Sequence, residues 1–338
     1  MQMIPLASTG RATTCLGFGG SSLMGALNRR QSLALLESAY DAGIRHFDTA
    51  PIYGYGEAES CLGEFLARHR ADCTVTTKFG IPRPRNQPLI RVARAIVGPM
   101  VQRSPALKRR LQGVGRQGPA RQDTSAEPVA PVIPNPIFTA EQARASLKRS
   151  LRELKTDRID LFLLHEVRAI DLAADPAGGT LLDMLEGLVA AGTIGAFGVG
   201  SEAARVGELL VRHPRYCRVL QYEWSVFDDV VAQGSAFRIH HRSLSANFPG
   251  LVARLKAEPQ KLKQLSQEVG EDLGDREMLA NLMLKASLVH NPGCVVLFSS
   301  KSPRHVEDNV AVAGDARLEG PARRLYEYLR RERTDGGG

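Results

Sequence analysis

Short apolar runs alternate with amphipathic segments along most of the chain. Eight runs of four to six residues are typical of buried strands: Leu16–Gly19, Arg45–Asp48, Thr74–Lys78, Asp160–His165, Ile194–Val199, Arg218–Gln221, Phe237–His240 and Cys294–Leu297. Segments with helical spacing of apolar residues lie between and after them: Arg29–Ala42, Glu57–Arg68, Thr139–Leu154, Leu181–Ala191, Ala203–Val211, Leu251–Val289, Pro303–Ala313 and Ala322–Arg333. This alternation predicts a parallel α/β sheet, and eight strands favour closure into a (β/α)8 TIM barrel.

The strand–helix rhythm predicts one TIM-barrel domain over residues 1–333 and a disordered tail over residues 334–338, which end in three glycines. Two helix starts carry recognisable signals. Thr139 and Gln142 have the spacing of a capping box, and Pro303 suits the first position of a helix.

One long segment, residues 81–137, interrupts the rhythm after the third predicted strand. It is too long for an ordinary strand–helix loop, and only Leu89–Val101 has helical spacing. Ten Lys/Arg and no Asp or Glu lie between Ile81 and Gln122, so the net charge of +8 is local and the rest of the chain is close to neutral. Three interpretations of this basic insertion stay open: a solvated lid beside the active site, an acceptor for an acidic substrate or partner protein, or a nucleic-acid or membrane arm. The third is disfavoured because Phe138 is the one aromatic residue near it.

Composition narrows the class of protein. Hydrophobic residues make up 43% and charged residues 24% of the chain, which is ordinary for a globular protein with a large core. Five scattered cysteines without C-x-x-C spacing, no signal-peptide pattern and no apolar run of about 18 residues favour the cytoplasm and argue against a membrane span. We read each cysteine as a small buried apolar residue. No G-x-G-x-x-G motif opens a helix, so a Rossmann fold is not supported. The chain has no H-E-x-x-H motif, and the adjacent His240 and His241 do not have metal-ligand spacing, so a metal site is not expected.

Ionisable side chains stand at the ends of three predicted strands. Asp48 and Lys78 end the second and third strands, Tyr53 follows Asp48 in a loop rich in Gly and Pro, and His165 ends the fourth strand. In a parallel barrel these strand ends converge on one mouth, so the four side chains are expected to share a pocket. A carboxylate, a phenol, an amine and an imidazole are the groups needed to move a proton to or from a carbonyl oxygen.

The same residues resemble a known family. Phe47-Asp48-Thr49-Ala50-x-x-Tyr53-Gly54, followed by Glu59 and Leu62-Gly63, is similar to the signature of the aldo-keto reductases. Thr77-Lys78 and Asp160–His165 match the next two motifs in order, and the resemblance extends from Leu16 to Gly314 apart from the insertion. The run Ala50–Gly56 is most similar to the branch that includes bacterial aldose and pyridoxal dehydrogenases.

The resemblance implies hydride transfer between a nicotinamide cofactor and a carbonyl compound: an aldehyde, a ketone or a sugar lactol. Tyr53 would be the general acid/base that gives its proton to the carbonyl oxygen. Its ordinary pKa is about 10, and Lys78, held by Asp48, is expected to lower it. His165, in its neutral form, would donate a hydrogen bond to the carbonyl oxygen and orient the substrate.

The resemblance further implies a dinucleotide site on the later strands. Gln221 would hold the nicotinamide carboxamide, Gly200 and Ser201 replace two residues that usually contact the same group, and His241 stands where an aromatic ring commonly stacks. Six residues correspond to the pyrophosphate and adenosine site: Ser299, Ser300, Lys301, Arg304, His305 and Asn309. The start of the last predicted barrel helix is suited to an anion. Local positive charge favours NADP(H) and leaves NAD(H) open.

Two other functions stay open at this point. The replacements at Gly200, Ser201 and His241 are compatible with a regulatory or scaffolding barrel that binds the nicotinamide cofactor without turnover. Lys78 could also act as the Schiff-base amine of a lyase. For all three functions (oxidoreductase, regulatory barrel or lyase) the ligand is a small molecule. Neither a nucleic acid nor a membrane is expected as a partner.

Overall fold

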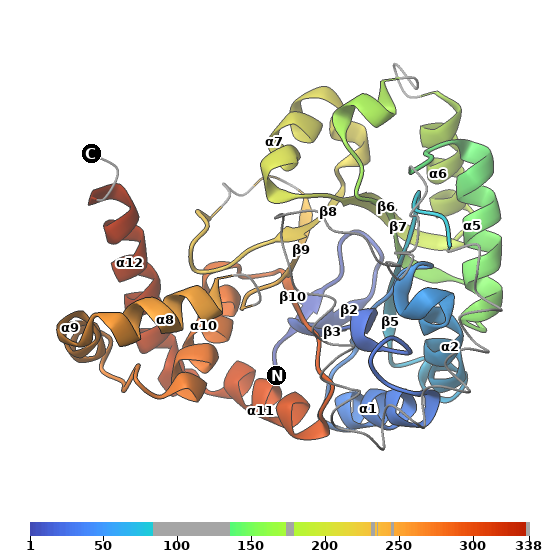
Figure 1. Ribbon diagram of the computed structural model, residues 1–338. Coiled ribbons are helices and arrows are strands. Elements are labelled where there is room, and N and C mark those ends of the chain that lie inside the picture. The colour runs from blue at the N-terminus through green and yellow to red at the C-terminus, as the bar shows by residue number, and fades with distance from the viewer. Residues whose placement is uncertain (84–135, 174–178, 231–233, 235, 245–246, 336–338) are drawn as a thin grey trace, which may run out of the picture.

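The fold is built on eight strands: β3 (Leu16–Gly19), β4 (His46–Asp48), β5 (Thr74–Phe79), β6 (Ile159–His165), β7 (Ile194–Gly200), β8 (Val219–Glu223), β9 (Phe237–His241) and β10 (Val295–Phe298). The computed structural model describes residues 1–83, 136–173, 179–230, 234, 236–244 and 247–335. The strands are parallel and form a closed barrel in the order β10-β3-β4-β5-β6-β7-β8-β9 (Figure 1). The prediction of a (β/α)8 TIM barrel is therefore confirmed.

Side chains alternate between the barrel interior and the surrounding helices. On β6, Leu161 and Leu163 belong to the interior cluster with Ile239 and Val295, whereas Phe162 and Leu164 pack in the outer layer. The period of two residues places the strand-end side chain of His165 on the inner side, at the carboxyl end of the strand. This end of the barrel is called the mouth below.

A short hairpin, β1 (Met3–Pro5) and β2 (Ala12–Thr14), closes the opposite end of the barrel. Ile4 and Leu6 are buried and join the interior cluster of the barrel. The sequence analysis did not predict this hairpin, because each strand has three residues and β1 buries only one of them.

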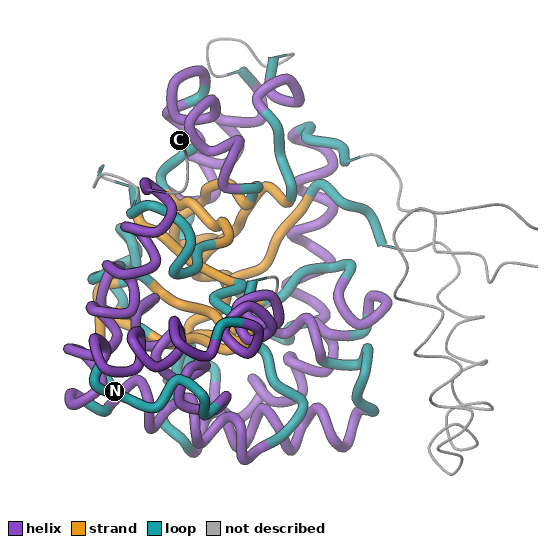
Figure 2. The backbone as a smooth tube through the Cα atoms, turned by 60° about the vertical axis from the view of Figure 1, so that its left-hand side comes forward, coloured by secondary structure: helices purple, strands orange, loops and turns teal. Residues whose placement is uncertain are grey.

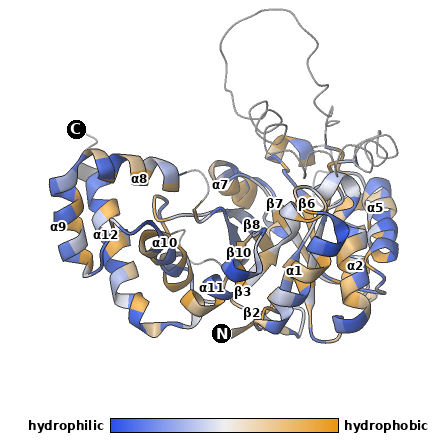
Figure 3. Cartoon of the chain, turned by 60° about the horizontal axis from the view of Figure 1, so that its bottom comes forward, coloured by the Kyte–Doolittle hydropathy of each residue, from blue (hydrophilic) through white to orange (hydrophobic). Residues whose placement is uncertain are grey.

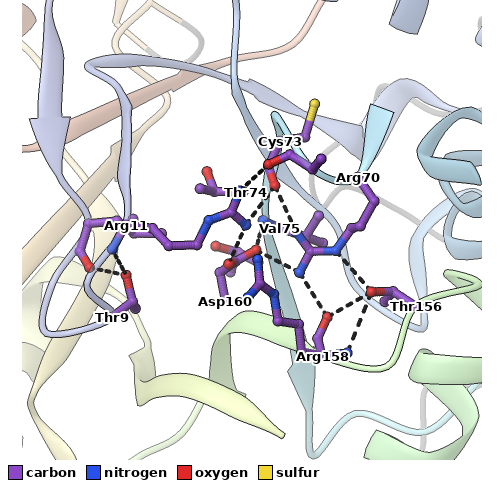
Figure 4. Close-up of polar contacts among 12 residues, drawn as sticks. Thr9, Arg11, Arg70, Cys73, Thr74, Val75, Thr156, Arg158 and Asp160 are labelled. Carbon is purple, nitrogen blue, oxygen red and sulfur yellow. Dashed lines mark hydrogen bonds and ion pairs between the residues drawn. The ribbon is translucent and has the colours of Figure 1, made fainter. Parts of the chain in front are cut away.

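A buried carboxylate ties the hairpin to the barrel at this closed end (Figure 4). Asp160, the second residue of β6, accepts a hydrogen bond of 2.7 Å from the backbone N–H of Val75. Its two oxygens also pair with Arg11 at 2.8 Å and with Arg70 at 3.0 Å. Residues from the hairpin, from β5 and from the end of a helix therefore meet on one side chain.

Helices surround the barrel (Figure 2). Six of them are α1 (Arg29–Asp41), α2 (Ala58–His69), α5 (Ala140–Glu153), α6 (Thr180–Ala190), α7 (Ala203–Arg212) and α11 (Pro303–Gly314), with short 3-10 turns at Gly20–Ser22, Tyr53–Gly56, Ala169–Leu172, Pro214–Tyr216 and Ala316–Leu318. The sequence analysis placed no helix between the sixth and seventh predicted strands, and the described part of the segment between β8 and β9 contains none.

The predicted helical region Leu251–Val289 is three helices: α8 (Phe248–Ala257), α9 (Pro259–Val269) and α10 (Arg276–His290). Pro259 begins α9, and Gly270 ends it with a left-handed φ of 82°. With α12 (Glu319–Asp335) they form a helical lobe beside the barrel (Figures 1 and 3). The lobe has its own apolar core around Trp224, and α12 extends two residues beyond the predicted end at Arg333.

The two ends of the basic insertion meet just beyond β5. The Ile137 N–H donates to the Gly80 carbonyl oxygen at 2.9 Å, and Phe138 packs so closely on Gly80 (φ 112°) that a Cβ there would lie 2.2 Å from its ring. Arg83 pairs with the buried Glu59 at 2.6 Å. The predicted helix over Leu89–Val101 lies outside the described residues, and the limits and role of the insertion stay predictions.

All five cysteines are free thiols, four of them buried and Cys15 half-buried. Burial raises the pKa of Cys61 to about 11 and the pKa of Cys73 and Cys217 to about 12, so these thiols stay protonated. Among the helices of the described residues, none combines the length and the apolar character needed to cross a membrane.

Candidate active site

A cavity of about 560 Å³ opens at the mouth of the barrel. It is lined by residues from all eight strands or from the segments that follow them: Gly19, Ser21, Asp48, Tyr53, Lys78, His165, Glu166, Gly200, Ser201, Gln221, His241, Arg242, Ser243, Leu244, Leu297, Phe298 and Ser299, with Leu284 from α10 and Asn309 from α11. A volume of this size is typical of small-molecule sites. The four residues Asp48, Tyr53, Lys78 and His165 all line this one cavity.

Lys78 is the centre of the polar contacts. Its Nζ donates to Asp48 Oδ1 at 2.6 Å and to the Thr49 carbonyl oxygen at 3.0 Å. The other carboxylate oxygen of Asp48 accepts from Gln221 Nε2 at 2.8 Å. Lys78 and Asp48 are almost completely buried, so the ion pair is held by the barrel and shielded from water.

Tyr53 lies over this pair. The Lys78 Nζ is 5.0 Å from the centre of the Tyr53 ring, and the His165 ring meets the phenol edge-on at a centroid distance of 5.9 Å. The turn that carries Tyr53 has left-handed φ angles at Gly54 (58°), Tyr55 (56°) and Gly56 (88°). At Gly54 a Cβ would lie 2.4 Å from the Leu23 carbonyl oxygen, so glycine is required for the turn to approach the barrel this closely.

The charges in the cavity are set by burial and by Lys78. Burial lowers the pKa of Lys78, but Asp48 and Tyr53 raise it by more, so its pKa lies above the ordinary value and the amine is an ammonium. Burial, Lys78 and His241 hold the pKa of His165 well below its ordinary range, so this imidazole is neutral. Burial, the largest of several opposing effects, lowers the pKa of His241 to about 4.

The prediction for the pKa of Tyr53 was wrong in its net direction. Lys78 does lower this pKa, as expected, but burial of the phenol raises it by more, and Asp48 and Glu166 add to the rise. The sequence motif places the ammonium beside the phenol. It does not reveal how far the ring is removed from water.

Six of the ten residues predicted to bind a cofactor line the cavity: Gly200, Ser201, Gln221, His241, Ser299 and Asn309. Ser201 also has a structural role, because its Oγ donates to the Val167 carbonyl oxygen at 2.7 Å. At Gly200 a Cβ would lie 3.5 Å from Gln221 Oε1 and 3.4 Å from the Leu164 carbonyl oxygen. Ser299 Oγ donates to the Gly19 carbonyl oxygen at 2.8 Å, which joins β10 to β3 at the rim.

The other four predicted cofactor residues do not line the cavity. Lys301, Arg304 and His305 are exposed at the start of α11. Ser300 is buried, and its Oγ donates to the Ser302 carbonyl oxygen at 2.9 Å, so it shapes the turn before α11.

Nine residues of the cavity wall were not predicted as site residues by the sequence analysis: Gly19, Ser21, Glu166, Arg242, Ser243, Leu244, Leu284, Leu297 and Phe298. Glu166 and Arg242 each follow a histidine that ends a strand, and each has a left-handed φ, 56° and 61°. The histidines His165 and His241 themselves carried the only signal that could have indicated their neighbours.

Comparison with known proteins agrees with the fold and the motifs. The model of the aldo/keto reductase family matches residues 15–244, and the chain belongs to this family. It is 33% identical over 204 residues to D-threo-aldose 1-dehydrogenase from a Pseudomonas species, covering 58% of this chain and 52% of the relative. Pyridoxal 4-dehydrogenase from Microbacterium luteolum is 42% identical over 78 residues, covering 22% of this chain and 23% of that protein. The alignments thus span about half or less of these relatives.

Solved structures match over nearly the whole chain. A glycerol dehydrogenase from Gluconobacter oxydans has a TM-score of 0.63 at 16% identity, covering 97% of this chain and 94% of that one. An aldo-keto reductase from Bacillus halodurans has a TM-score of 0.61 at 19% identity, covering 96% of both chains. At these identities the likeness concerns the fold.

Proposed function

We propose that this protein is a nicotinamide-dependent oxidoreductase that interconverts a carbonyl group and an alcohol, or a sugar lactol and a lactone. The observation that carries the proposal is the buried Asp48–Lys78 pair with the Tyr53 phenol above it and the neutral His165 beside it. This arrangement can give a proton to an oxygen atom and take it back.

In the direction of reduction, Tyr53 donates its phenolic proton to the carbonyl oxygen of the substrate. The Lys78 ammonium stabilises the phenolate that remains, and Asp48 keeps Lys78 charged and in place. Neutral His165 donates a second hydrogen bond to the same oxygen and so orients the substrate. A nicotinamide cofactor held in the cavity would supply the hydride to the carbonyl carbon in this direction and would take it back in the reverse direction.

The cavity residues fit such a cofactor. Gln221 donates a hydrogen bond from its Nε2 to Asp48, and its Oε1 lies beside Gly200, which has no side chain. Gln221 and Ser201 would therefore hold the carboxamide. His241 would stack on the ring, and Ser299 and Asn309 would hold the pyrophosphate and adenosine portion. Exposed Lys301 and Arg304, with His305 and Ser300, stand at the start of α11. The positive charges of Lys301 and Arg304 support NADP(H) over NAD(H).

The Schiff-base alternative is weakened by the same geometry. A Schiff-base lysine must be a neutral amine to attack a carbonyl carbon. The Nζ of Lys78 donates to Asp48 and to the Thr49 carbonyl oxygen, and the raised pKa keeps it protonated. We therefore assign Lys78 to stabilising Tyr53.

The free, buried thiols support a cytoplasmic location.

The substrate class follows from the relatives and from the polar mouth. Two of the relatives are named as an aldose dehydrogenase and a pyridoxal dehydrogenase. Aldoses and pyridoxal are both compounds with a carbonyl or lactol carbon. A panel of sugars, aromatic aldehydes and keto compounds, assayed in both directions with NADPH or NADP⁺ and with NADH or NAD⁺, tests this proposal.

The first prediction concerns the proton donor. Tyr53→Phe is expected to reduce kcat at least about a hundredfold, because it removes the acid/base and leaves the cavity shape intact. NADPH affinity, followed by fluorescence titration, should stay within about twofold, and NADPH should bind more tightly than NADH. Tyr55→Phe is the matched control, since this exposed phenol two residues later does not line the cavity.

Near-normal turnover by Tyr53→Phe would reject the proposed mechanism. A protein that binds NADPH but turns over no compound in the panel would favour the regulatory or scaffolding alternative.

A further inference from the structure

Glu166 places a carboxylate at the mouth of the cavity, directly after His165. It is the one acidic residue of the cavity wall besides Asp48 among the described residues, and Asp48 is engaged by Lys78 and Gln221. The proton transfer described above has no use for a second carboxylate.

The backbone turns this side chain toward the cavity. Alternation along β6 would send residue 166 outward, in line with Phe162 and Leu164. Instead, Glu166 has a φ of 56°, and the next residue, Val167, takes the buried outward position. A left-handed conformation is costly for glutamate, and such strain is often kept where a site requires it.

The turn is held firmly on its far side. The Val167 N–H donates to the Gly200 carbonyl oxygen at 3.2 Å, and the Val167 carbonyl oxygen accepts from Ser201 Oγ at 2.7 Å. Because Val167 is held on both sides, the backbone at Glu166, and with it the direction in which the side chain leaves the backbone, is set before a ligand arrives.

No partner within the described part of the chain donates a hydrogen bond to the Glu166 carboxylate. Arg242 and Arg205 attract it electrostatically, whereas Glu202 and Glu223 repel it. Glu202 is already paired with Arg205 at 3.1 Å. As far as the described residues go, both carboxylate oxygens of Glu166 are therefore open to accept hydrogen bonds from a molecule in the cavity.

We propose that Glu166 determines substrate specificity by accepting hydrogen bonds from hydroxyl groups next to the reacting carbonyl carbon. Two carboxylate oxygens suit two neighbouring hydroxyls of a polyhydroxylated substrate, and the same charge repels substrates that carry a carboxylate. The inference rests on the proposed oxidoreductase function and narrows its substrates to neutral or cationic hydroxylated carbonyl compounds.

The test compares two matched pairs of aldehydes on the full chain with saturating NADPH. Glyceraldehyde against propanal reports recognition of hydroxyls, and succinic semialdehyde against butanal reports exclusion of a carboxylate. The variants are Glu166→Gln, which keeps the size, and Glu166→Ala, which removes the group. Glu202→Gln is the control, because this neighbouring carboxylate does not line the cavity.

The unmodified chain should prefer glyceraldehyde, measured as the ratio of kcat/KM values. Glu166→Ala should lower this ratio about tenfold and Glu166→Gln by less, because glutamine keeps one acceptor oxygen. Both variants should raise the succinic semialdehyde to butanal ratio severalfold, while NADPH affinity and the Glu202→Gln ratios stay unchanged.

Ratios in both Glu166 variants within about twofold of the unmodified chain would overturn the inference and leave the proposed function standing. A preference of the unmodified chain for propanal would do the same. Absence of turnover of every aldehyde by the unmodified chain would instead overturn the proposed function, and this inference with it.

Discussion

Single residues inside the barrel set the chemistry of its mouth through burial more than through their intrinsic character. Asp48, Lys78 and Gln221 hold one another by hydrogen bonds of 2.6–2.8 Å, so the ammonium beside Tyr53 is fixed without help from solvent. Such preorganisation reduces the rearrangement needed when charge develops on a substrate oxygen. Burial also explains why the pKa of Tyr53 rises even though Lys78 lies next to it.

His46 lies one layer below Asp48 in the same interior. Its ring nitrogens meet Thr74 Oγ1 at 3.0 Å and Thr76 Oγ1 at 3.2 Å. Burial lowers its pKa to about 4, although Asp48 and Asp160 oppose the shift. Between pH 6.5 and 4, His46 is therefore protonated in the unfolded chain and neutral in the folded chain. The free energy of unfolding consequently falls as the pH is lowered through this range.

The second prediction follows from this sign. Moving from pH 7 to pH 5 should cost the unmodified chain about 2 kcal/mol through His46 alone, and His46→Gln should lose that much less. Urea unfolding at the two pH values measures the difference. His305→Gln, at an exposed position of α11, is the control and should keep the full loss. An equal loss in His46→Gln and the unmodified chain would contradict the assignment.

At the residue scale, the sequence predicted the strand-end residues that converge on the cavity. It missed the residues whose side chains reach the cavity through a left-handed backbone conformation. Strand-end positions and the ordered motif were enough to bring Asp48, Tyr53, Lys78 and His165 into one pocket. Glu166 and Arg242 could not be found in that way, because strand alternation points them away from the cavity. The left-handed φ that reverses them has no sequence signal in a residue other than glycine.

At the scale of elements, hydrophobic periodicity predicted every barrel strand to within two residues at each end. The errors fall where local signals are weak or were given too little weight. The hairpin strands are too short for alternation to be read. The breaks on either side of α9 did carry signals, Pro259 and Gly270, which the helical spacing of the whole region obscured. Thr139 does cap α5, accepting from the Gln142 N–H at 3.3 Å.

The third prediction concerns the contact between elements at the closed end of the barrel (Figure 4). Asp160→Ala should destabilise the fold by about 3 kcal/mol, because Arg11, Arg70 and the Val75 N–H all lose a buried partner. Urea unfolding measures this loss. The ratio kcat/KM should stay unchanged at low temperature, since Asp160 lies at the end of the barrel away from the cavity.

The matched control for Asp160 is an exposed ion pair. Glu64 pairs with Arg29 at 3.1 Å with both side chains well exposed, so Glu64→Ala should cost less than about 1 kcal/mol. Equal losses in the two variants would show that the buried network does not join the hairpin to the barrel.

At the scale of the whole molecule, two apolar cores share one helix. Leu279, Leu282 and Met283 of α10 pack in the lobe, whereas Leu284 of the same helix packs against barrel strands β3 and β10 and helix α11. Trp224, which directly follows β8, belongs to the lobe core and lies 5.8 Å from the ring of Tyr326 on α12. A helix common to both cores makes it unfavourable for either to unfold alone.

The fourth prediction is therefore a single unfolding transition. Trp224 is the only tryptophan, so its fluorescence reports the lobe, while protection of the buried Cys61 and Cys73 from thiol labelling, read by peptide mass spectrometry, reports the barrel. Leu325→Ala in the lobe should cost about 3 kcal/mol and shift both midpoints equally, and Leu66→Ala on α2 should do the same from the barrel side. A fluorescence midpoint that moves while thiol protection persists would separate the lobe from the barrel as an independently folding unit. The cavity wall contributed by Leu284 would then depend on a part of the chain that can open while the catalytic strands stay intact.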